Sequence, residues 1–149
     1  MSVDVFLRNA AGRAGVPQRR SFERWIAAIP ALRRRSCEVN LMIVGSREGR
    51  RFNREFRQRD YATNVLSFPY EPLPWEKSAL LGDLVLCAPV VASEARAQGK
   101  ALRDHYAHLT IHGVLHLLGH DHETDAEAAA MEGLEVRILA GLGIANPYD

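Results

Sequence analysis

The sequence predicts a single α/β (α+β) domain, residues 1–149, in which about five to six helices pack on a small mixed sheet of four strands. Three observations favour this class. Four short apolar runs have the length of β-strands, longer segments place apolar residues at helical spacing, and Gly or Pro marks most borders. Strands and helices that alternate in mixed order are typical of a sheet covered by helices.

The first half of the chain contains three predicted strands and two predicted helices. The strands span residues 3–7, 38–44 and 64–68, and the helices span residues 18–29 and 47–57. The first helix has its apolar side chains at helical spacing and is closed by Pro30. Ser46 can cap the second helix, which carries much of the basic charge on an exposed face.

The second half contains a loop, the fourth strand and three more helices. The loop spans residues 70–80, the strand residues 82–88, and the helices residues 89–98, 103–118 and 125–142. Pro89 stands at the first position of its helix, where a missing N–H costs nothing, and Gly99 can end that helix. Thr124 and Glu127 form a capping box that opens the last helix.

Composition predicts a cytoplasmic protein without a membrane segment. Hydrophobic residues make up 47% of the chain and charged residues 25%, which is ordinary for a soluble globular protein. No stretch approaches the roughly 20 apolar residues of a membrane helix, and the N-terminus does not resemble a signal peptide. Cys37 and Cys87 both lie in strand-like apolar runs, so we expect two reduced core thiols.

The net charge of +1 conceals a strong asymmetry between the two halves. Residues 1–75 contain 14 Lys/Arg and 7 Asp/Glu, whereas residues 76–149 contain 5 and 11. The stretch from Arg33 to Arg59 contains nine arginines and three glutamates. Such a stretch suits a phosphate-bearing partner, because the planar guanidinium matches phosphate geometry, but a solvated arginine-rich helix has the same composition. Charge alone leaves both interpretations open.

The segment HGVLHLLGHDH, residues 112–122, predicts a metal site. His112 and His116 are four residues apart on a predicted helix, the spacing at which two imidazoles reach one cation. Gly119 can end the helix and return the chain, which brings His122 toward the pair. Three imidazoles with an open fourth position are typical of catalytic zinc. Nickel, copper and iron also accept imidazole, so the ligands favour zinc without excluding those metals.

Other polar residues near this segment have less specific interpretations. His105 and His108 lie upstream on the same helical stripe, where we expect hydrogen-bonded core residues or groups that support the ligands. Asp121 could orient a ligand imidazole or accept hydrogen bonds from turn amides. Asp83 could hold an imidazole or an arginine, or cap a turn, and His120 has no assigned role.

Gly113 bears on the chemistry of the predicted site. In HExxH zinc peptidases the residue after the first histidine is a glutamate that acts as general base, and Gly113 cannot replace it. Phosphodiester hydrolysis asks instead for a nucleophile near the metal and positive charge around the phosphate. Arginine supplies that charge through paired hydrogen bonds. The chemistry therefore favours a phosphoryl substrate, with a metalloprotease-like hydrolase as the alternative.

The histidine segment resembles the signature of the YbeY family, bacterial zinc-dependent endoribonucleases that mature rRNA. FNREFRQRDYATNVLSFP, LGDLVLC and GLGIANPYD resemble further family segments, so the likeness covers roughly residues 38–148. It implies a small mixed sheet flanked by helices, single-stranded RNA as substrate, and roles in small-subunit rRNA 3′-end maturation and ribosome quality control. Two departures are mild, since Phe56 and His120 each replace a usual tyrosine.

By motif position, the resemblance implies that His112, His116 and His122 bind one zinc ion per chain and that Arg57 faces the metal cleft. Our hypothesis from the sequence is a zinc-dependent endoribonuclease that cuts single-stranded rRNA and contacts the small ribosomal subunit. The nucleophile is a metal-activated water or the 2′-hydroxyl of the RNA. A non-catalytic ribosome-assembly factor with a structural zinc is the second alternative, beside the metalloprotease-like hydrolase.

Overall fold

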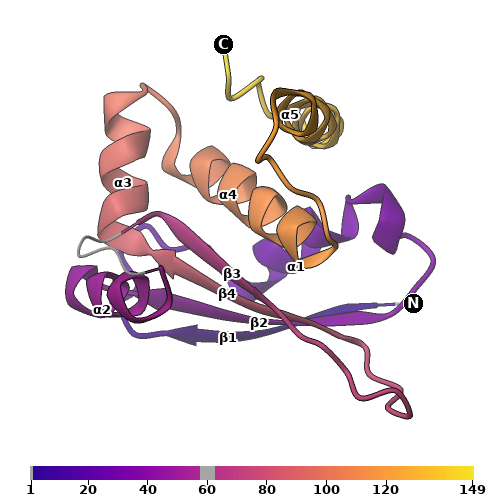
Figure 1. The fold of residues 1–149 in the computed structure, drawn as a ribbon. Helices are drawn as coiled ribbons and strands as arrows, with labels where there is room; N and C mark the ends of the chain where they lie inside the picture. The colour runs from indigo at the N-terminus through magenta and orange to yellow at the C-terminus, as the bar shows by residue number, and fades with distance from the viewer. Residues whose placement is uncertain (1, 58–62) are drawn as a thin grey trace.

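The computed structural model describes residues 2–57 and 63–149 and shows a four-stranded sheet with helices on both faces (Figure 1). The elements follow the order predicted from the sequence. They are β1 (Val3–Asn9), α1 (Arg19–Ala27), a short 3₁₀ turn (Pro30–Leu32), β2 (Cys37–Val44), α2 (Ser46–Arg57), β3 (Val65–Pro69), β4 (Leu80–Cys87), α3 (Ala88–Ala97), α4 (Leu102–Leu117) and α5 (Asp125–Gly141). The predicted class, a small mixed sheet with helices, is confirmed.

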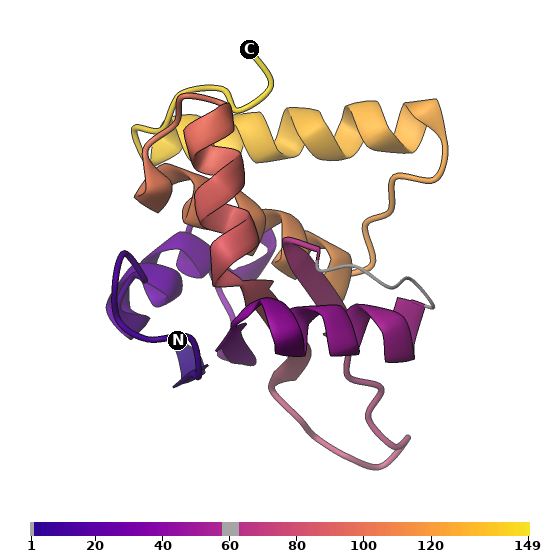
Figure 2. The same cartoon turned by 90° about the vertical axis from the view of Figure 1, so that its left-hand side faces the viewer.

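The sheet is mixed because one connection is a hairpin and the others are crossovers. Its strand order is β1-β2-β4-β3. β1 pairs with β2 and β2 with β4 in parallel, each pair being joined through helical connections, whereas β3 runs antiparallel to β4. The predicted proline-containing loop joins β3 and β4 and extends beyond the body of the molecule (Figures 1 and 2).

The two faces of the sheet carry two separate apolar clusters. Leu84 and Leu86 of β4 point toward α1 and α4 and join the larger core, together with the inward residues of β2. Val85 and Cys87 point the other way and pack with Phe52 of α2. This alternation is the period of two that the strand prediction rests on. The larger cluster fixes α4 above the sheet, and α5 lies on the far side of α4 (Figure 1).

The ends of two helices differ slightly from the predicted residues. α1 ends at Ala27, and Pro30 opens the 3₁₀ turn instead of directly closing the helix. Ser46 is the first residue of α2.

Both buried cysteines have free thiols, and burial raises the pKa of each. In the part of the chain that the structure describes, none of the helices combines the length and apolar character needed to cross a bilayer.

The capping box at the start of α5 is confirmed. The amide of Glu127 donates to Thr124 Oγ1 at 3.1 Å, and the amide of Thr124 donates to Glu127 Oε1 at 3.2 Å. These bonds satisfy two backbone donors that the helix itself leaves without partners. They also fix the start of the helix that returns over the histidine segment.

Replacing Thr124 with alanine should lower the free energy of unfolding by about 1 kcal/mol, because the first turn of α5 loses its side-chain acceptor. Urea unfolding followed by circular dichroism measures the change. Thr124→Ser is the matched control and should retain most of the stability, since its hydroxyl can accept the same bond. Equal losses in the two variants would contradict the capping role.

Candidate metal centre

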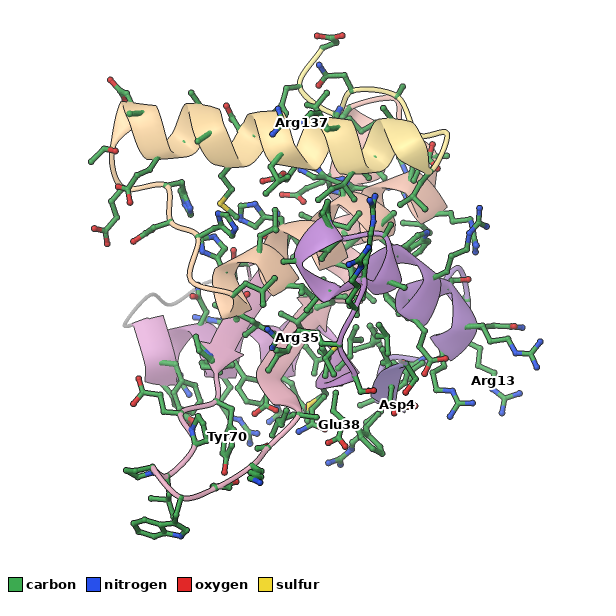
Figure 3. All side chains as sticks on the ribbon, turned by 90° about the vertical axis from the view of Figure 1, so that its right-hand side faces the viewer. Asp4, Arg13, Arg35, Glu38, Tyr70 and Arg137 are labelled. Atoms are coloured by element: carbon green, nitrogen blue, oxygen red, sulfur yellow. The ribbon has the colours of Figure 1, made fainter. Side chains whose placement is uncertain are left out.

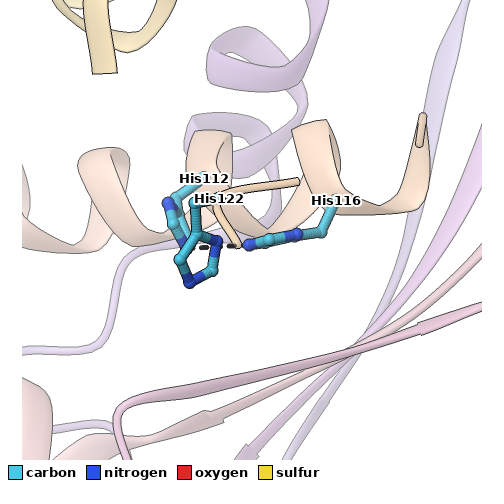
Figure 4. Close-up of side chains that lie close together, drawn as sticks. All are labelled: His112, His116 and His122. Atoms are coloured by element: carbon cyan, nitrogen blue, oxygen red, sulfur yellow. Dashed lines mark hydrogen bonds between the residues drawn. The ribbon is translucent and has the colours of Figure 1, made fainter. Parts of the chain in front are cut away.

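The end of α4 is shaped by a glycine turn that brings three histidines together. The amide of Gly119 donates to the carbonyl of His116 at 3.0 Å, and that of His120 donates to Leu115 at 3.0 Å. Gly119 has a φ of +98°, so these bonds form a left-handed helix termination that favours glycine. The chain then reverses, and His122 returns to the side of α4 that carries His112 and His116 (Figure 4).

The geometry of the three imidazoles suits one metal ion. One ligand atom from each of His112, His116 and His122 lies within 4.8 Å of the others. The Nε2 atoms of His112 and His116 are 3.1 Å apart. Two nitrogens bound to tetrahedral zinc at about 2.05 Å would be roughly 3.3 Å apart, close to the separation of this pair. The structure therefore brings together the three histidines that the sequence predicts as ligands.

The surroundings of His116 favour its neutral imidazole, the form that binds metal. Burial lowers the pKa of His116, and the neighbouring His112 and His122 lower it further, against a smaller opposing effect from the His120 backbone and Asp121. His112 and His116 are partly buried, whereas His122 is exposed. The cluster is therefore open to solvent from the side of the returning loop.

A buried carboxylate from α5 lies behind His112. Glu135 is fully buried, and its Oε2 is 3.0 Å from His112 Nδ1. Its Oε1 is 2.7 Å from His108 Nε2 and accepts a 2.6 Å hydrogen bond from the Tyr148 hydroxyl. Burial alone would raise the pKa of Glu135, but hydrogen bonds from His108, His112 and Tyr148 lower it to about 2. Glu135 is thus a carboxylate at neutral pH.

The two upstream histidines lie in the protein interior, as the sequence predicts. His105 is buried, and its Nε2 is 2.9 Å from Glu94 Oε1 on α3. Asn64, just before β3, donates to the same carboxylate. His108 shares the Glu135 carboxylate with His112, and the two imidazole rings also meet edge to face at 6.4 Å between their centroids.

The structure explains Gly113 by close packing. A Cβ at this position would lie 2.8 Å from Leu84 Cδ2, 3.2 Å from Ser67 Oγ and 3.3 Å from a Val65 methyl. Ser67 donates from its Oγ to the Gly113 carbonyl at 3.1 Å, which joins β3 to α4. The position faces the sheet, so a glutamate here would point into the core and could not act on a metal-bound substrate. The glycine permits α4 to approach the sheet.

Two aspartates considered from the sequence lie outside the ligand network. Asp121 Oδ1 accepts from the amide of His122 at 2.7 Å, which agrees with the interpretation as a turn acceptor. Asp83 accepts from Asn40 Nδ2 at 2.9 Å. It borders a groove of about 880 Å³ on the α2 side of the sheet, the face opposite to Leu84 and α4. A bond from Asp83 to a ligand imidazole is therefore excluded by the alternation of β4.

Arg57 is the last residue of α2, and its side chain lies outside the described part of the structure. Its predicted place in the metal cleft stays a prediction. The preceding turns of α2 present the exposed basic side chains that the sequence predicts; they line a shallow polar depression formed by Arg47, Glu48, Arg50, Arg51 and Arg54.

Glu135 and Tyr148 were not predicted from the sequence. Glu135 occupies the buried face of α5 together with Met131, Ile138 and Leu139. An acidic residue on an apolar helical stripe was the available signal, because such a residue needs buried partners. Tyr148 carries no local signal, since its partner depends on how the C-terminal tail folds back over α5.

The packing of Gly113 can be tested against another helical glycine. Gly113→Ala should lower the free energy of unfolding by on the order of 1 kcal/mol, because overpacking outweighs the gain in helix propensity. Gly133→Ala in α5 is the control and should raise stability by up to about 1 kcal/mol, since its nearest neighbour is a flexible Arg137 nitrogen at 3.5 Å. Chemical denaturation of both variants measures the difference. Stabilisation by Gly113→Ala would contradict the close approach of α4 to the sheet.

Comparison with known proteins agrees with the geometry. A chain from Stenotrophomonas maltophilia named endoribonuclease YbeY is 58% identical over 98% of this chain and 93% of its own length. A protein of the same name from Alkalilimnicola ehrlichii is 57% identical over 93% and 86%, respectively. The solution structure of a Thermotoga maritima protein has a similar fold, with a TM-score of 0.58 and 23% identity over 94% of this chain and 91% of that one. The family described as endoribonuclease YbeY matches residues 13–143. This chain therefore belongs to the YbeY endoribonuclease family, as the resemblance of its histidine segment predicts.

Proposed function

We propose that this protein is a zinc-dependent endoribonuclease that cuts single-stranded RNA, with rRNA and the small ribosomal subunit as its targets in the cytoplasm. The observation that carries the proposal is the open cluster of His112, His116 and His122 in a chain of this family. The relatives' printed name, endoribonuclease, supports the reaction class. Small-subunit rRNA 3′-end maturation and ribosome quality control are the roles that we propose for the activity.

The three histidines would hold one zinc ion per chain and leave further coordination positions for solvent or substrate. Three protein ligands are typical of catalytic zinc, whereas structural sites use four. When bound, zinc lowers the pKa of a coordinated water and polarises a phosphoryl oxygen. The exposed position of His122 leaves that side of the cluster accessible to a large substrate such as RNA.

The basic surface of α2 supports a nucleic-acid substrate. Arg47 and Arg51 are exposed on this helix, which leads directly to Arg57 and the segment before β3. We assign these arginines to the RNA backbone and Arg57 to the scissile phosphate, where a guanidinium stabilises developing negative charge. β3 itself is bonded to α4 through Ser67 and Gly113, so the end of α2 leads by a short segment to the helix that carries the ligands.

The alternatives receive less support. A metalloprotease-like hydrolase would need a general base, and the position that supplies it in HExxH enzymes is packed against the sheet at Gly113. An assembly factor with a structural zinc would need a fourth protein ligand. The cluster formed by the described residues offers three.

Metal analysis of purified protein tests the site. His122→Ala should bind zinc much more weakly than the unaltered protein, because two imidazoles from α4 remain where three were present. His120→Ala, which changes the adjacent turn without removing a predicted ligand, is the control and should retain stoichiometric zinc. Full zinc content in His122→Ala after dialysis would refute the three-histidine centre.

Cleavage of labelled single-stranded RNA tests the role of Arg57. Arg57→Glu should reduce cleavage by about 10²–10³-fold, the usual cost of losing one group that stabilises transition-state charge. Arg57→Lys should recover part of the rate, because charge is kept and the bidentate fork is lost. Zinc content should be unchanged in both.

A separate variant distinguishes substrate binding from the chemical step. Arg51→Glu should weaken RNA binding and reduce its dependence on salt, since fewer counterions are released. Cleavage that persists in a chelator and in Arg57→Glu would show that the nuclease is a contaminant. Turnover of a peptide, with no turnover of RNA, would favour the metalloprotease-like alternative.

A further inference from the structure

We propose that Glu135 is a positioning residue that fixes the tautomer and orientation of His112 for metal binding. The inference rests on the proposed metal centre and adds a component from a different helix. His112 has one ring nitrogen toward Glu135 and the other toward the ligand cluster, with Nδ1 3.0 Å from Glu135 Oε2 and Nε2 3.1 Å from His116 Nε2. A proton held on Nδ1 leaves the lone pair of Nε2 available for the cation.

A carboxylate imposes this tautomer because it can only accept hydrogen bonds. Glu135 is fully buried, and its hydrogen-bond partners are protein groups. At 3.0 Å, a neutral His112 must place its proton on Nδ1 to make a bond with Oε2. Carboxylates that hold the second nitrogen of a ligand histidine in this way orient the ring and strengthen its bond to the metal.

The two carboxylate oxygens of Glu135 have different partners. One oxygen is held by His108 and Tyr148, and the other contacts His112. Oε1 receives His108 Nε2 at 2.7 Å and the Tyr148 hydroxyl at 2.6 Å. Oε2 has His112 as its partner. His108 and Tyr148 therefore fix the carboxylate from one side, and the remaining oxygen is directed at the ligand. Through Tyr148, the C-terminal tail takes part in holding the metal centre.

The placement of Glu135 argues against a general structural role. Its neighbours on the buried face of α5, Met131, Ile138 and Leu139, are apolar and pack into the main core. A carboxylate at this position carries a large desolvation cost that an apolar side chain of similar size would avoid. The hydrogen bonds described above offset that cost, and the bond to His112 gives the carboxylate a use at the metal centre.

Glu135→Gln is a sharp test because it keeps the size of the side chain and changes one acceptor into a donor. If the amide oxygen takes the place of Oε1, His108 and Tyr148 keep their bonds. The amide NH₂ then faces His112 Nδ1, which must become an acceptor, so the proton moves to Nε2 and blocks the metal-binding lone pair. Glu132→Gln removes the same charge from an exposed position of α5 and is the matched control.

Zinc affinity, measured by competition with a chromophoric chelator, should fall by about 10–100-fold in Glu135→Gln and stay unchanged in Glu132→Gln. Nitrogen-15 NMR of the histidine rings in metal-free protein should show His112 protonated on Nδ1 in the unaltered chain and on Nε2 in Glu135→Gln. Tyr148→Phe should produce a smaller loss of affinity, because the bond to His112 remains.

Unchanged zinc affinity in folded Glu135→Gln would overturn the inference. So would a metal-free unaltered protein whose His112 carries its proton on Nε2, a result that needs no variant and stands even if Glu135→Gln does not fold. Neither measurement depends on RNA cleavage. Failure of the metal centre itself is recognised separately, by full zinc retention in His122→Ala.

Discussion

The position of α4 between the sheet and α5 is the constraint on which the rest of the molecule depends. A helix enclosed in this way has to find most partners for its polar side chains inside the protein, and α4 carries four histidines on one stripe. The first two contact carboxylates from other helices: His105 contacts Glu94 of α3, and His108 contacts Glu135 of α5. His112 lies between the buried and the exposed part of the stripe, with one ring nitrogen toward Glu135 and the other toward His116. The stripe thus leads from the interior to the proposed metal centre. Side chains fill the space between α5, which carries Arg137, and the helix beneath it (Figure 3).

Two glycines make this arrangement possible for different reasons. Gly113 lets α4 approach the sheet closely, because any side chain would meet Leu84 and Ser67. Gly119 ends the helix in the left-handed region and turns the chain so that His122 joins the cluster. Close packing therefore requires glycine at the position where the peptidase pattern has glutamate. A phosphate substrate needs cationic groups to stabilise its developing negative charge, and the arginines of α2 are the proposed source.

Local sequence predicted what depends on local physics. All four strands, the five main helices, the capping box at Thr124 and the glycine turn at Gly119 follow from periodicity and backbone chemistry, and so does the gathering of the three histidines. Contacts between elements distant in sequence could not be predicted in this way. Glu135 meets His112 because α5 folds back over α4, and Asp83 lies on the far face of the sheet because of the register of β4.

The three clustered histidines, His112, His116 and His122, are proposed to hold a zinc ion with an open coordination position. X-ray absorption spectroscopy at the zinc edge of the purified holoprotein tests it most directly. Three imidazole nitrogens at about 2.0–2.1 Å are expected in the spectrum, together with at least one oxygen ligand from solvent. A zinc ion surrounded by four protein ligands, or one whose shell contains fewer than three imidazoles, would contradict it.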